Sequence, residues 1–76
     1  MEISSQKSRT IRGLLSIGTK ELSYAGIEEA LIESEHILMR LLMCSRSELY
    51  LSEGTQAPED VQKIFLEIIE RRKSRK

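Results

Sequence analysis

Apolar residues recur three or four positions apart through most of the chain, which is the spacing of one face of an α-helix. The first such stripe predicts a helix, and its members are Ile11, Leu14, Leu15, Gly18, Leu22 and Ala25. The helix is expected to stop at Gly26, because glycine readily takes the left-handed conformation that closes a helix. Ile27 would then pack back on Leu22 in a Schellman ending. Gly18 lies inside the stripe, where glycine indicates either a break in the helix or the close approach of another helix.

A second helix is predicted from about Glu28 to Met43. Its apolar face carries Leu31, Ile37, Leu38, Leu41 and Leu42. Glu28 and Glu29 would lie in the first turn, where carboxylates interact favourably with the positive end of the helix dipole.

A capping box predicts a short third helix. Ser45 and Glu48 have the spacing in which the serine hydroxyl accepts from the glutamate N–H while the glutamate side chain accepts from the serine N–H. This helix would hold Leu49, Tyr50 and Leu51 and would end before Gly54, after which residues 55–57 are expected to form a loop.

The last helix is expected to hold Pro58 in its first turn, a position that proline suits. Its apolar face carries Val61, Ile64, Phe65, Ile68 and Ile69. No segment alternates apolar and polar residues with the period of a strand, so we predict an all-α fold. Short connections favour a compact bundle of four to five short helices. We assign residues 10–76 to one helical domain and expect residues 1–9 to be disordered.

The length of the chain limits its function. Its 76 residues are 39% hydrophobic and 32% charged, which suits one small globular domain and excludes a two-domain enzyme. One histidine and one cysteine are too few for a structural zinc site. His36 and Cys44 lie about 12 Å apart along a helix, which is too far for a catalytic dyad. We therefore expect no catalytic, cofactor-binding or metal-binding residue in this chain.

Charge is unevenly distributed, although the net charge is zero. Residues 1–20 carry four basic groups and one acidic group, residues 21–60 carry two basic and nine acidic groups, and residues 61–76 carry six basic and two acidic groups. Five of the last six residues are cationic. These cations either complement the negative end of the last helix or contact an acidic partner or RNA.

Several blocks of the sequence, in order and with compatible spacing, resemble the N-terminal domain of the HemK/PrmC release-factor glutamine methyltransferases. The resemblance covers about residues 10–76, and its blocks are residues 10–15, 26–27, 32–42, 45–51 and 65–73. The most specific element is the block at 45–51 followed, twenty residues later, by Arg71 and Arg72. Ala30 and Cys44 depart from the family, which often has a proline and a glycine there, and both departures concern helix boundaries.

The resemblance implies a role within a larger protein. Members of the family transfer a methyl group from S-adenosylmethionine to the glutamine of the Gly-Gly-Gln motif of a peptide-chain release factor. Their catalytic domain follows the helical one, so we expect that domain and its S-adenosylmethionine beyond residue 76, and no cofactor in this chain. Residues 10–76 would then be the substrate-binding domain, with a release factor as its partner. The sequence leaves open whether the ribosome is a further partner.

Candidate partner contacts in the matching blocks are Arg46, Tyr50, Arg71 and Arg72. Tyrosine combines an apolar ring with a polar tip, arginine offers planar donors for carboxylates, and both types are enriched at interfaces. The competing interpretations place Tyr50 in the core and pair Arg46 with a local acid.

Two other classes of function compete with this one. Exposed Ile32, Met39 or Leu66 would suit a stand-alone helical interaction or dimerisation module. The basic C-terminal end would suit a small nucleic-acid-binding domain, but the zero net charge and a pI of about 6.6 argue against it. We expect a monomer that does not contact nucleic acid directly. The lone cysteine and the lack of a signal-peptide pattern predict a cytoplasmic protein without membrane association.

Overall fold

The computed structural model describes residues 9–75, which form four α-helices. These are α1 (Ile11–Tyr24), α2 (Ala30–Leu42), α3 (Arg46–Leu51) and α4 (Glu59–Arg75). The described residues contain no strand, and Thr10 and Gln56 form an isolated bridge. The predicted all-α bundle is confirmed. The expected disorder of residues 1–9 falls outside the described residues except at Arg9, whose carbonyl accepts a hydrogen bond from Ala57 N (3.0 Å).

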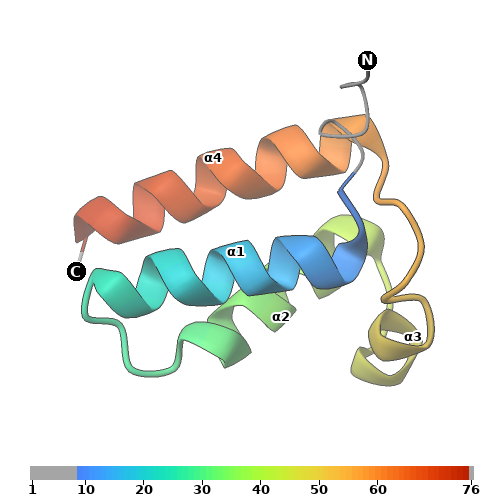
Figure 1. Cartoon of the computed structure of the whole chain (residues 1–76), viewed down its shortest axis with the longest axis horizontal. Helices are drawn as coiled ribbons and strands as arrows, with labels where there is room; N and C mark the ends of the chain where they lie inside the picture. Colours follow the sequence, from blue (N-terminus) through green and yellow to red (C-terminus); the bar gives the residue numbers. More distant parts are fainter. Residues whose placement is uncertain (1–8, 76) are drawn as a thin grey trace, which may run out of the picture.

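The three longer helices form the body of the molecule, and each contacts the other two. In Figure 1, α2 runs back below and behind α1, and α4 lies above α1 and runs in the same direction as α1. The short helix α3 lies at the end of the bundle where α2 finishes and α4 starts, and it packs on α2. The long helices that follow each other along the chain are therefore antiparallel, which makes α1 and α4 parallel.

The end of α1 has the predicted Schellman geometry. Gly26 has φ 90°, in the region that favours glycine. Ile27 N donates to Leu22 O and Gly26 N donates to Ser23 O, each at 3.0 Å. Ile27 packs against the buried core, as the motif requires.

The predicted bounds of α2 are wrong at both ends. The helix begins at Ala30, so Glu28 and Glu29 lie in a turn that redirects the chain after the Schellman ending of α1. It ends at Leu42, because Met43 takes a left-handed conformation with φ 54°.

The helix α3 begins with the predicted capping box. Glu48 N donates to Ser45 Oγ (3.2 Å), and Ser45 N donates to Glu48 Oε1 (2.9 Å). The helix stops at Leu51, before Gly54 as predicted. Its apolar side chain Leu49 is fully buried, which anchors α3 to the core.

The loop after α3 closes the exposed start of α1. Ile11 N donates to Thr55 O (3.0 Å) and Arg12 N donates to Glu53 O (2.9 Å). The first N–H groups of a helix have no partner within the helix, so these two carbonyls satisfy donors that would otherwise need water. The start of α1 thus depends on a segment about forty residues away in the sequence.

The last helix begins one residue later than expected. Pro58 precedes α4, and its carbonyl accepts a hydrogen bond from Gln62 N (3.0 Å). The buried hydrophobic residues come from all four helices and the loop before α4, and they are Ile11, Leu14, Leu15, Leu22, Ala30, Ile37, Leu38, Leu49, Ala57, Val61, Phe65 and Ile69.

Gly18 lies where α1 closely approaches α2 and α4. This is one of the two outcomes predicted from its place in the apolar stripe. A Cβ at this position would lie 2.6 Å from Ser34 Oγ on α2 and 2.7 Å from Phe65 Cζ on α4. Ser34 is itself buried and donates to Ala30 O (2.9 Å), so it has little freedom to move away. α1 continues through Gly18 without a break.

We predict that Gly18→Ala destabilises the protein by about 1–3 kcal/mol, because the added methyl group overpacks the junction of three helices. This loss would outweigh the better helix propensity of alanine, which is about 1 kcal/mol. Chemical denaturation of both proteins measures the difference. Gly54→Ala is the matched control, since its Cβ would come no closer than 3.9 Å to another atom. Equal stabilities of the two variants would contradict the prediction.

Candidate functional site

The four candidate partner contacts lie at two separate places. Arg46 and Tyr50 are on α3, whereas Arg71 and Arg72 are in the last turns of α4. The structure therefore does not bring them together into one contact surface.

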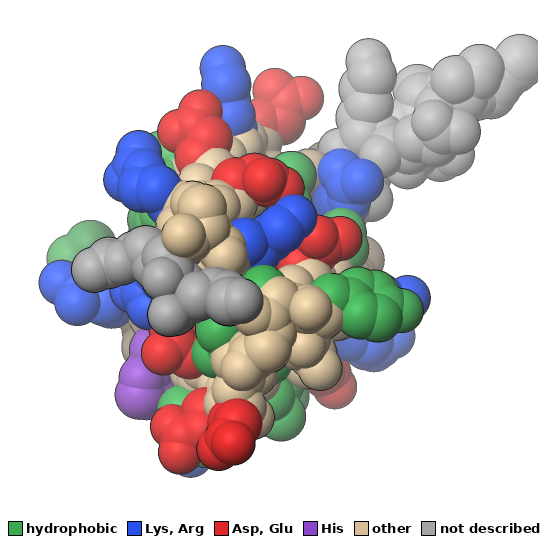
Figure 2. All heavy atoms as spheres, turned by 90° about the vertical axis from the view of Figure 1, so that its left-hand side faces the viewer, with side chains coloured by type: hydrophobic (Ala, Val, Ile, Leu, Met, Phe, Trp, Pro, Cys, Tyr) green, Lys and Arg blue, Asp and Glu red, His purple; other side chains and the backbone are tan. Residues whose placement is uncertain are grey.

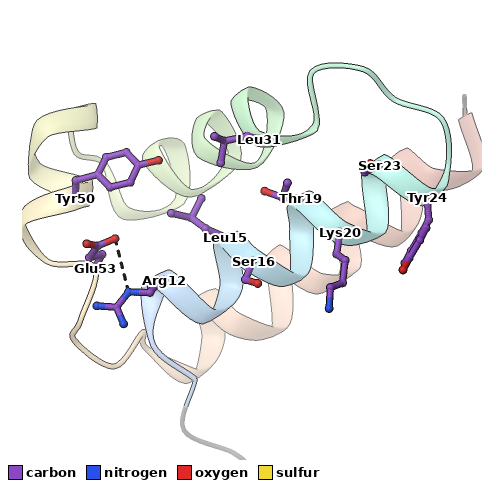
Figure 3. Close-up of a pocket in the computed structure, with 10 residues that line it drawn as sticks. All are labelled: Arg12, Leu15, Ser16, Thr19, Lys20, Ser23, Tyr24, Leu31, Tyr50 and Glu53. Atoms are coloured by element: carbon purple, nitrogen blue, oxygen red, sulfur yellow. Dashed lines mark ion pairs between the residues drawn. The ribbon is translucent and has the colours of Figure 1, made fainter.

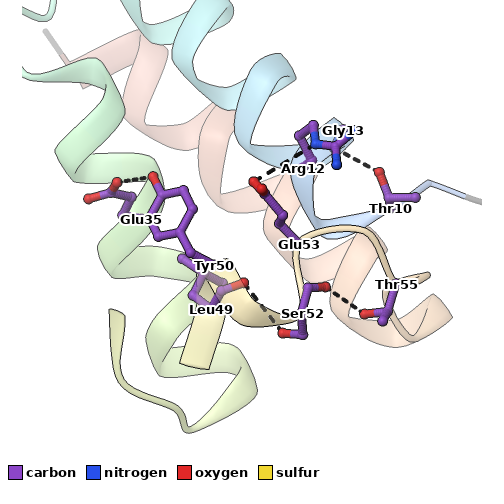
Figure 4. A network of polar contacts seen from close by, with 9 residues as sticks. All are labelled: Thr10, Arg12, Gly13, Glu35, Leu49, Tyr50, Ser52, Glu53 and Thr55. Carbon is purple, nitrogen blue, oxygen red and sulfur yellow. Dashed lines mark hydrogen bonds and ion pairs between the residues drawn. The ribbon is translucent and has the colours of Figure 1, made fainter. Parts of the chain in front are cut away.

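The two contacts on α3 meet a buried carboxylate. Glu35 on α2 is only 5% exposed. Arg46 Nε lies 3.2 Å from Glu35 Oε1, and the Tyr50 hydroxyl donates to Glu35 Oε2 (Figure 4). This hydrogen bond, with a smaller contribution from burial, raises the pKa of Tyr50 above its usual value. Arg46 thus pairs with a local acid, while the Tyr50 ring stays 38% exposed and outside the core.

The basic end of α4 is tied to the other long helices. Arg72 pairs with Glu33 on α2. Lys73 Nζ donates to Glu21 Oε1 on α1 (2.7 Å) and to Glu70 Oε2 within α4 (3.1 Å). These two hydrogen bonds raise the pKa of Lys73, with the bond to Glu21 as the larger cause.

This basic end does not form a free cationic patch. Figure 2 looks onto this end of the molecule, where basic and acidic side chains are interspersed over its surface. Arg71 is exposed and has no ion-pair partner within the described part of the chain. Of the three cations in this run whose side chains the structure describes, Arg71 is the one left available to a partner.

An open groove of about 610 Å³ lies beside α1 (Figure 3). One long side is α1, which contributes Arg12, Leu15, Ser16, Thr19, Lys20, Ser23 and Tyr24. Leu31, from the first turns of α2, faces this side. Tyr50 and Glu53 close the end near α3. Tyr50 is therefore the one candidate contact that lines this groove.

Sequence reasoning missed this groove because it depends on how three helices meet. Leu31 was expected on the buried stripe of α2, but it is 46% exposed. Its neighbours across the groove, Ser16 and Lys20, belong to the polar side of α1 and therefore predict an ordinary solvated face. The available signal was a leucine in the first turn of α2, just after the connection that contains Gly26.

No cluster of metal-ligating side chains occurs within residues 9–75. His36 is exposed on α2. Burial, with a smaller contribution from Glu48, raises the pKa of the Cys44 thiol, which disfavours the reactive thiolate. Across the same residues, every helix is too short or too polar to cross a membrane.

The three residues that would support self-association differ in exposure. Ile32 is 43% exposed, whereas Met39 and Leu66 are partly buried and pack against the core. Of these three residues, only Ile32 is exposed enough to contact a second copy of the chain.

Comparison with known proteins gives one result. Residues 13–76 match the family described as the PrmC N-terminal domain. No curated protein and no solved structure matches the chain. The match covers α2, α3 and α4 and all but the first two residues of α1.

We predict that Tyr50→Phe lowers the free energy of unfolding by about 1–2 kcal/mol, because it removes a hydrogen-bond donor from a buried carboxylate. Tyr24→Phe removes the same hydroxyl from a side chain that is 83% exposed, and it should change stability by less than about 0.5 kcal/mol. Urea denaturation of both variants tests the difference. A loss of equal size in the two would show that the contact with Glu35 does not stabilise the fold.

The effect of Tyr50→Phe should also depend on pH. The folded protein holds the Tyr50 proton more tightly than the unfolded chain does, since the pKa is raised on folding. The stabilisation is therefore complete below the ordinary tyrosine pKa of about 10 and is lost as pH rises through the higher folded value. We expect the stability difference between the parent and Tyr50→Phe to narrow above about pH 10. Denaturation at several pH values measures this, and a constant difference would contradict it.

Proposed function

The chain belongs to the PrmC N-terminal domain family, and from this membership we propose that it is the substrate-recognition domain of an S-adenosylmethionine-dependent protein methyltransferase. The substrate is a peptide-chain release factor, and the reaction methylates the glutamine of its Gly-Gly-Gln motif in translation termination. S-adenosylmethionine and the reacting groups belong to a separate catalytic domain, and this chain contributes binding. The protein acts in the cytoplasm as a monomer.

The observation that carries this proposal is the family match over residues 13–76. The match runs through nearly the whole described fold, so it concerns the arrangement of the bundle and not one ordinary helix. The open groove beside α1 supports a binding role, because binding sites are typically concave and mostly apolar with a few polar groups.

The ion pairs decide which of the candidate contacts are available to a partner. Tyr50 offers an exposed ring whose hydroxyl is already held by Glu35, so the ring costs little entropy to order on binding. Arg71 offers an unpaired guanidinium among the described residues. Arg46 and Arg72 are paired with acids, so a partner would have to share or replace those acids.

The geometry gives little support to nucleic-acid binding. Arg72 and Lys73 are paired with Glu33 and Glu21, whereas a nucleic-acid interface usually carries a clear basic surplus on one face. Contact with the ribosome would then be made through the release factor and not through this chain.

We predict that the ¹⁵N-labelled chain binds an unlabelled peptide-chain release factor with saturable, localised chemical-shift changes. The changes should include the amides of the Tyr50 region, because its exposed ring lines the groove. An unrelated protein of similar size and charge is the control and should leave the spectrum unchanged. A spectrum that also stays unchanged with the release factor, at the highest attainable concentration, would refute the proposal.

A further inference from the structure

The groove beside α1 has the length of a short helix. The first and last α1 residues that line it, Arg12 and Tyr24, are about 18 Å apart along the helix, or roughly three turns. Leu31, which is 46% exposed, supplies apolar surface along its middle, whereas Leu15 is buried and contributes little. Tyr50 closes the end near α3 (Figure 3). A peptide that binds by β-strand addition needs an open strand edge to pair with, and the described residues contain no strand. An amphipathic helix needs only an apolar groove of this kind.

The groove also holds a polar atom without a partner. Thr19 Oγ1 is buried, and it makes no hydrogen bond with any described residue. Thr19 faces the groove between α1 and Leu31 (Figure 3). A buried hydroxyl without a partner is unfavourable, and a change of the Thr19 rotamer that brings Oγ1 to the groove surface would let an occupant supply the missing hydrogen bond.

The charge along the groove favours an acidic occupant. Lys20 is exposed and has no ion-pair partner within the described part of the chain. Arg12 is only loosely paired with Glu53, at 3.8 Å and with its side chain 66% exposed. The charged residues that line the groove therefore sum to one positive charge. By contrast, residues 21–60 of the chain are strongly acidic.

We propose that this groove binds an amphipathic helix of about three turns, with its apolar face on Leu31 and Tyr50 and with a carboxylate beside Lys20. The release factor supplies this helix, and in that respect the inference rests on the proposed function. The groove then recognises a surface of the release factor separate from its reacting glutamine, so it fixes the substrate while the catalytic domain acts.

Two matched pairs of variants test the occupant. Lys20→Glu reverses the unpaired charge, and Lys63→Glu makes the same change at an exposed lysine of α4 outside the groove. Leu31→Asp places a charge on the apolar wall, and Ile64→Asp does so at a residue of α4 with similar exposure, 42% against 46%. Because all four side chains are exposed, each variant should fold, which circular dichroism checks.

Calorimetric titration of each variant with a full-length release factor measures the change in binding affinity. Lys20→Glu and Leu31→Asp should each weaken binding by about tenfold or more, while the controls stay within about twofold of the parent. Added salt should weaken the parent more than it weakens Lys20→Glu, because the proposed contact is an ion pair at the surface. Shift changes should map to the groove residues of α1 and to Leu31.

The failures can be told apart. If the parent binds and both groove variants bind as tightly, the inference is wrong and the proposed function stands. If the parent does not bind, the proposed function fails and the inference fails with it. If sedimentation shows a dimer that Leu31→Asp disperses, a second copy of the chain occupies the groove, which also overturns the inference.

Discussion

The packing of the bundle depends on the absence of a side chain at Gly18. Both Ser34 of α2 and Phe65 of α4 occupy the space that a Cβ would need, so α1 touches both helices at one level. This contact determines which side of α1 is buried. Side chains two positions apart on a helix point about 160° away from each other. Ser16 and Lys20 therefore lie on the side of α1 opposite to Gly18 and face solvent. The same glycine that closes the core therefore leaves uncovered the side of α1 that forms the groove.

The end of the groove depends on a second constraint, the buried carboxylate of Glu35. A helix of six residues such as α3 is too short to be stable alone. It is held by Leu49 in the core, by its capping box and by the two contacts that Arg46 and Tyr50 make with Glu35. A buried carboxylate is costly unless its oxygens are partnered, so Glu35 and α3 stabilise each other. The position of the Tyr50 ring follows from this mutual support.

The features that could be predicted from the sequence are those determined by residues close together in the chain. The Schellman ending at Gly26 and the capping box of Ser45 and Glu48 are complete within four to six residues, and both occur as predicted. The capping of α1 by the carbonyls of Glu53 and Thr55 and the groove depend on distant segments. The same holds for the candidate contacts. The sequence shows which arginines and acids are present, but it does not show which of them form ion pairs.

Some of the charges that distinguish the segments of the sequence are paired within the fold. Glu21 of α1 and Glu33 of α2 pair with the basic end of α4, so the contrast between an acidic middle and basic ends is partly neutralised where these elements meet. Long-range attraction of a partner requires a broad surface of one sign, and pairing removes such a surface. Recognition by this domain must then come mainly from shape and from apolar contact at short range, with single charges such as Lys20 selecting among partners. A groove with one unpaired cation at its edge meets that requirement better than the basic end of α4 does.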